Sequence, residues 1–153
     1  MHAISRRLAL LALGALTMFG TTACGDDEPS GPGASVAGAY NLSTINGDAV
    51  PATVYEGSEL GFYYKVEVLS GLLTLRANGT FDDVTTIRET EGNNPPESSV
   101  VEASGTFVRE GNTLTLTDQE SEDSYMLTVQ SDGSLVQSDQ FGGIPITVRY
   151  VRR

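Results

Sequence analysis

The sequence contains one cysteine, one histidine and no tryptophan in 153 residues. The histidine is His2 and the cysteine is Cys24, so both lie in the first sixth of the chain. The remaining residues cannot form a Ser-His-Asp triad, a Cys-His pair or an internal disulfide. They also lack the nitrogen and sulfur ligands on which most zinc and copper sites depend. We therefore expect no catalytic residue, no metal site and no cofactor, and hence no enzyme.

Basic residues are scarce as well. The chain has nine Lys and Arg against twenty Asp and Glu, which gives a net charge of −11. Residues 24–153 keep seven of the basic residues and all twenty acidic ones, so their net charge is about −13. Such a surface repels phosphate backbones and anionic lipid headgroups. Nucleic acid is therefore excluded as an expected partner.

No apolar run is long enough for a stable membrane-spanning helix. The longest, residues 8–19, follows Arg6 and Arg7 and has about a dozen residues, against the ~20 that a span requires. A basic region followed by a short apolar region is typical of a signal peptide that is removed. The partial twin-arginine pattern around Arg6 and Arg7 leaves the twin-arginine route as an alternative, but the strongly apolar run favours general secretion.

The apolar run leads through small residues to Thr21-Thr22-Ala23-Cys24-Gly25. This segment resembles the lipobox of bacterial lipoproteins, although Thr21 stands where the family usually has Leu. The resemblance implies acylation of Cys24, with palmitate among its acyl chains, and cleavage of the signal peptide, residues 1–23. The protein would then be exported and anchored to a membrane of the cell envelope, inner or outer. The alternative for Cys24 is a free thiol or an intermolecular disulfide.

Residues 24–35 would form the acylated cysteine and a flexible tether, because they are rich in Gly, Pro and acids without periodicity. From residue 36 to 153, short stretches of β-branched and aromatic residues alternate with Gly, Asn and Asp. This pattern predicts one all-β domain. The expected strands are 37–45, 63–69, 72–77, 80–90, 99–109, 113–118, 124–131, 134–138 and 144–151, and segment 49–62 is a short strand or an irregular lid.

Two dipeptides, Asn78-Gly79 and Asp132-Gly133, predict β-hairpins with type I′ turns. Both belong to a weak repeat, apolar–x–apolar–x–x–Asn/Asp–Gly–Thr/Ser–apolar, and Asn46-Gly47 is expected to end the first strand. Apolar residues alternate with polar ones along the strands, as in an antiparallel sheet with one wet face. This alternation assigns the following residues to the inner face: Tyr40, Leu42, Val66, Val68, Leu73, Leu75, Phe81, Ile87, Val101, Phe107, Leu114, Leu116, Leu127, Val129, Ile146 and Val148. Eight or nine such strands favour closure into an up-and-down barrel, because closure removes the two exposed edges.

The first and last strands carry a further resemblance. Val36-Ala-Gly38-Ala-Tyr40-Asn-Leu42 is similar to the Gly-x-Trp opening of lipocalin-like domains, with Tyr40 in place of Trp, and Ile146–Arg152 is similar to their closing strand. The resemblance implies a small lipocalin-like β-barrel whose closing arginine packs over the opening aromatic ring. We expect Tyr40 and Arg149 to form this pair, with Arg152 as the competing candidate on the other side of the strand.

Carboxylates are the remaining chemical groups. Asp82-Asp83 and the segment 118–123 are the densest clusters, and both are expected on exposed positions. A carboxylate pair could catalyse glycoside hydrolysis, or segment 118–123 could bind Ca²⁺, but this segment lacks the central Gly and the ligand spacing of an EF-hand. Solvated charge is the favoured interpretation of both clusters.

One aromatic cluster marks a candidate ligand mouth: Tyr55, Phe62, Tyr63 and Tyr64. These rings could bind a small apolar or amphipathic ligand, or they could plug the end of the barrel, as aromatic residues commonly do in small barrels. Two functions stay open. The favoured one is a structural or protein-interaction domain with a filled core and an envelope protein as partner. The alternative is binding of a small apolar ligand at the barrel mouth.

Overall fold

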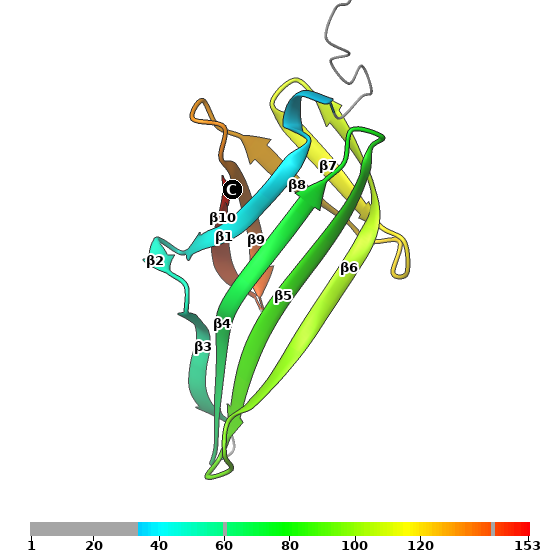
Figure 1. The fold of residues 1–153 in the computed structure, drawn as a ribbon. Helices are drawn as coiled ribbons and strands as arrows, with labels where there is room; N and C mark the ends of the chain where they lie inside the picture. Colours follow the sequence, from blue (N-terminus) through cyan, green and yellow to red (C-terminus); the bar gives the residue numbers. More distant parts are fainter. Residues whose placement is uncertain (1–33, 60, 142) are drawn as a thin grey trace, which may run out of the picture.

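The computed structural model describes residues 34–59, 61–141 and 143–153. They form one short 3₁₀ helix, η1 (Ala34–Val36), and ten β-strands (Figure 1). The strands are β1 (Gly38–Ile45), β2 (Asp48–Ala49), β3 (Ala52–Glu59), β4 (Phe62–Leu75), β5 (Thr80–Glu91), β6 (Glu97–Glu110), β7 (Thr113–Asp118), β8 (Ser124–Val129), β9 (Leu135–Phe141) and β10 (Ile144–Arg152). Cys24 and residues 25–33 of the expected tether lie outside the described residues, whereas Ala34 and Ser35 belong to η1. No helix within the described residues is long and apolar enough to cross a membrane.

Eight of these strands form a closed antiparallel barrel. Neighbours in the chain pair from β4 through β10, and β1 closes the barrel by pairing with β10 on one side and with β4 on the other. The two remaining strands, β2 and β3, attach outside this closed set. The prediction of an all-β up-and-down barrel is confirmed, and it is the architecture that the lipocalin resemblance implies.

Segment 49–62, which the sequence left open, is largely strand β3. It pairs with the first half of β4, from Phe62 to Val68, whereas β1 pairs with the second half, from Leu72 to Leu75. The two expected strands at 63–69 and 72–77 are therefore one long strand, with an irregular register between Val68 and Ser70 on its β5 side. A β-bulge of this kind bends a strand, which lets one side of β4 pair first with β3 and then with β1.

The predicted hairpins at Asn78-Gly79 and Asp132-Gly133 are present, but their turn type differs from the prediction. Only the glycine of each pair has a positive φ, 83° at Gly79 and 78° at Gly133. Each loop is a turn followed by one left-handed glycine, and the Asn or Asp side chain accepts hydrogen bonds from the Thr or Ser two residues later. These bonds explain the weak repeat. Positive φ at both residues occurs instead at Asn46-Gly47, which joins β1 to β2.

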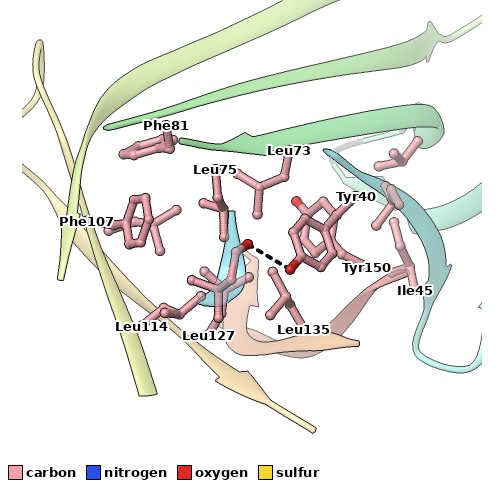
Figure 2. Close-up of a cluster of buried hydrophobic side chains, with 14 of the residues drawn as sticks. Tyr40, Ile45, Leu73, Leu75, Phe81, Phe107, Leu114, Leu127, Leu135 and Tyr150 are labelled. Atoms are coloured by element: carbon pink, nitrogen blue, oxygen red, sulfur yellow. Dashed lines mark hydrogen bonds between the residues drawn. The ribbon is translucent and has the colours of Figure 1, made fainter. Parts of the chain in front are cut away.

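Apolar side chains fill the barrel interior (Figure 2). The largest of them are at most 2% exposed: Tyr40, Leu73, Leu75, Phe81, Leu114, Leu116, Leu127 and Leu135. Two inward glycines could leave a gap, but neither does. A Cβ on Gly71 would lie 2.9 Å from the Cβ of Leu42, and a Cβ on Gly105 would lie 2.0 Å from the carbonyl oxygen of Thr117. Neighbouring strands therefore occupy the space beside both glycines.

The end of the barrel beside the N-terminus is closed by η1, whose Val36 is 3% exposed. The Tyr40 hydroxyl donates to the Val36 carbonyl at 2.8 Å (Figure 2). The guanidinium that lies over the Tyr40 ring, at 5.8 Å from its centroid, belongs to Arg152. The expected pair with Arg149 is wrong, because the β1–β10 register places Arg152 opposite Tyr40 and Arg149 opposite Thr44. Arg149 instead forms an ion pair with Asp132 on the outside.

Candidate functional site

The β-sheet continues beyond the barrel. The first halves of β4 and β6 and the second half of β5 run past the barrel strands, and β3 adds a fourth strand beside β4 (Figure 1). We call this part, formed by residues 52–59, 61–68, 85–91 and 97–104, the sheet extension. It is the part of the described chain that a small closed barrel does not need, so it is the first place to look for function.

The four residues of the candidate ligand mouth all lie on the β3–β4 hairpin of the sheet extension. The Tyr55 and Tyr64 rings are tilted neighbours with centroids 5.9 Å apart, and Phe62 is 75% exposed beside the turn. Phe62, Tyr63 and Tyr64 line a surface pocket of about 690 Å³ together with residues 91–94 of the β5–β6 loop. The structure therefore brings the four residues into one region, at the tip of the sheet extension.

Two of these tyrosines are held by carboxylates. The Tyr64 hydroxyl donates to Glu89 Oε1 at 2.5 Å, and this bond raises the pKa of Tyr64 to about 12. The Tyr63 hydroxyl donates to Glu56 at 3.1 Å. These bonds fix both rings on a polar, acidic surface, and an apolar ligand prefers a pocket with mostly apolar walls. The pocket at the tip thus offers aromatic faces within an anionic rim.

A second group of polar residues lies inside the barrel, and sequence reasoning missed it. Asp82 and Asp83 were both expected outside, but Asp83 is on the inner face, in register with the buried Leu73. The Tyr150 hydroxyl donates to its carboxylate at 3.2 Å, and the Thr85 hydroxyl donates at 3.3 Å. Period-two alternation from Phe81 would have found Asp83, since inward positions on β5 are odd-numbered.

This group has one unsatisfied member. The Tyr125 hydroxyl is buried and has no hydrogen-bond partner among the described residues, and its ring packs edge-on against Phe81. Burial is the main cause that raises the pKa of Tyr125 and of Tyr150, and the charge of Asp83 adds to both. Burial also raises the pKa of Asp83, against the effect of its two hydrogen bonds. Burial therefore disfavours the charged form of all three groups.

The raised pKa of Asp83 predicts a pH-dependent effect of Asp83→Asn. At neutral pH the wild type carries the cost of a desolvated carboxylate, whereas an amide accepts the same bond from Tyr150 without charge. Because the pKa of Asp83 is raised by folding, the folded state binds a proton more readily than the unfolded state does. The contribution of Asp83 to the free energy of unfolding therefore falls as the pH rises through the folded pKa.

We therefore expect Asp83→Asn to increase the free energy of unfolding at pH 7, with the difference vanishing below the ordinary Asp pKa of about 3.9. Chemical denaturation of both proteins between pH 3 and 8 measures this difference. An Asp83→Asn protein that is less stable than wild type at pH 7 would show that the carboxylate is needed in its charged form.

The acidic segment 118–123 is the β7–β8 turn. Asp118 Oδ1 accepts the backbone N–H groups of Glu120 and Ser121, both at 2.8 Å, and these bonds lower the pKa of Asp118. The Gln119 N–H donates to the carbonyl of Ser104, which ties the turn to β6. Across the described residues, no group of three or more acidic, His or Cys side chains is arranged to hold a metal ion.

The chain matches no protein-family model, no curated protein sequence and no solved structure at a significant level. The description of the fold therefore rests on the strand pairing alone, which gives an eight-stranded antiparallel β-barrel with two additional strands.

Proposed function

We propose that this protein is a lipid-anchored component of the bacterial cell envelope, and that its β-barrel is a structural or protein-interaction domain without enzymatic activity. The N-terminal sequence supports the anchor, because a basic region, a short apolar run and small residues all converge on Cys24. The membrane would be contacted through the acyl chains on Cys24, since the strongly acidic domain repels anionic headgroups.

The filled interior is the observation that carries the interaction role. Barrels that transport small molecules keep an inner cavity, whereas the interior here is occupied by Leu, Phe and Tyr side chains. The inner side chains therefore serve to stabilise the barrel. What remains for function is the outer surface, and its most prominent feature is the sheet extension.

Replacement of the acylated cysteine tests the anchor. We expect Cys24→Ser to abolish labelling with radioactive or clickable palmitate and to move the protein from the membrane fraction to the soluble or uncleaved fraction. The double variant Cys24→Ser, Ser30→Cys retains one thiol but moves it away from the small-residue motif, so it should stay unlabelled. Labelling and normal maturation of Cys24→Ser would contradict the proposal.

A further inference from the structure

The sheet extension has two edges, and they are built differently. One edge is β3. The other is the first half of β6, residues 97–104, which pairs with β5 on one side only, because pairing with β7 begins at Gly105. No strand of the described chain covers the other side of these eight residues. We call them the β6 edge.

The direction of the free backbone groups follows from two hydrogen bonds. The Ser104 carbonyl accepts from Gln119 on the β7 side, and the Phe107 N–H donates to the Gly79 carbonyl on the β5 side. Backbone groups alternate in direction along a strand, so even-numbered residues of β6 point away from β5. The N–H and C=O groups of Ser98, Val100 and Glu102 therefore point outward, with no strand beside them in the described chain.

Natural proteins protect sheet edges with prolines, bulges or positive charges. The β3 edge has such protection: Pro51 precedes it, Gly57 interrupts it, and its register shifts between Thr53 and Tyr55. The β6 edge is less protected along its length. Pro95 and Pro96 precede it and Glu97 and Glu102 are charged, but its register with β5 is continuous, and the sequence 97–104 contains no Pro, Gly, Lys or Arg. Val100 and Val101 are 58% and 51% exposed at its centre. It is a regular strand that is ready to pair with another one.

The charges around the β6 edge indicate the chemistry of its partner. At its barrel end, Glu102 lines a surface pocket of about 430 Å³ with Asp118 and Glu120. At its tip end, Glu97 lines a pocket of about 440 Å³ with Glu89 and Glu91. Asp82 also lines the first pocket, and it is paired with Arg76. A second copy of this chain would bring the same carboxylates together, so self-pairing is disfavoured.

We propose that the β6 edge binds an extended basic segment of another envelope protein by β-strand addition. Main-chain hydrogen bonds to Ser98, Val100 and Glu102 would supply affinity, and the side chains would supply specificity. The segment carries apolar or β-branched residues beside Val100 and Val101. It carries Lys or Arg near both ends, about five residues apart, because Glu97 and Glu102 are separated by roughly 17 Å along the strand and point to opposite faces of the sheet. The envelope location of this partner rests on the function proposed above.

A synthetic peptide tests the proposal directly. The probe is a fluorescent six-residue peptide of alternating Thr and Val between two terminal lysines, titrated into the full-length protein in detergent. Fluorescence anisotropy is expected to show saturable binding that weakens with salt. The same peptide with terminal glutamates, or with N-methyl groups on alternate backbone nitrogens along one edge, should bind at least tenfold more weakly.

Two variants at one position separate backbone pairing from side-chain contact. Val100→Pro removes an N–H that points away from β5, so the β5–β6 ladder stays intact and the protein should keep its cooperative unfolding. We expect it to weaken peptide binding at least tenfold, whereas Val100→Thr should stay within about twofold of wild type. The double variant Glu97→Gln, Glu102→Gln should lose several-fold in affinity and most of the salt dependence, with Glu110→Gln on the barrel part of β6 as its control.

Three outcomes would overturn the proposal: no saturable binding of the lysine peptide, equal binding by Val100→Pro, or equal binding of the glutamate peptide. A dimer seen by sedimentation that Val100→Pro abolishes would assign the β6 edge to self-pairing instead. These outcomes leave palmitate labelling at Cys24 untouched, and loss of that labelling would leave the peptide titration unchanged. The anchor and the β6 edge are thus tested separately.

Discussion

Removal of residues 144–153 is expected to unfold the domain rather than to shorten it. Strand β10 pairs with β1 from Tyr40 to Ile45 and with β9 from Leu135 to Phe141, so its loss opens the barrel on two sides. The buried Tyr150 and the contact between Arg152 and Tyr40 would be lost with it. The core would then be exposed along a complete strand, and a small domain has only about 5–15 kcal/mol of stability to lose.

Far-UV circular dichroism and urea denaturation check this expectation, with loss of the cooperative transition as the expected result. A synthetic peptide of residues 144–153, added in excess, should restore part of the transition by refilling the gap between β9 and β1. A truncated protein that keeps a cooperative transition without the peptide would show that β10 is not needed for closure.

The second large effect is expected from Leu75→Ala, which should lower the free energy of unfolding by ~2–5 kcal/mol. Leu75 is 2% exposed and lies at the β1–β4 junction, opposite Gly38 on β1 and Phe81 on β5. Neighbouring strands on both sides hold the backbone in place, so the site cannot collapse around the smaller side chain. The surface variant Val108→Ala, at a position 57% exposed, should change stability by less than about 0.5 kcal/mol.

Equilibrium urea denaturation of the two variants measures the difference, and titration with a lipophilic dye accompanies it. A loss below about 1 kcal/mol for Leu75→Ala, or stronger dye binding in a domain that already binds dye, would indicate a hollow barrel. The alternative function, binding of a small apolar ligand, would then replace the interaction role. A loss of ~2–5 kcal/mol in the free energy of unfolding of Leu75→Ala, with no dye binding by the wild type, would support the filled interior.

The local features of this fold could be predicted from the sequence because they depend on neighbouring residues. Alternation of apolar and polar side chains located the barrel strands to within a few residues, and β7 coincides with its expected range of 113–118. The Asn-Gly and Asp-Gly pairs located two hairpins, because glycine accepts the positive φ that each turn needs. Most of the expected inner face is buried in the structure.

The sequence predicted burial and side-chain pairing wrongly where these depend on contacts between residues far apart in the chain. Val101 follows the inner-face pattern, yet it is half exposed, because at that point β6 has left the barrel for the sheet extension. Leu135 and Tyr150 are buried although the pattern did not select them. Arg152 rather than Arg149 meets Tyr40, because the antiparallel register of β1 with β10 pairs Tyr40 with Arg152 and places Arg149 further along β1, opposite Thr44.

The sequence by itself determined the class of fold, the hairpins, the acidic surface and the scarcity of catalytic chemistry, since each follows from composition or from short-range periodicity. Only the tertiary structure decided which residues point into the closed barrel, how β4 divides between β1 and β3, and where β6 is left without a neighbour. The physical reason is that strand pairing joins residues far apart in the chain. The register of the strands, and therefore the position of the free strand edges, is set by the packing of the whole barrel.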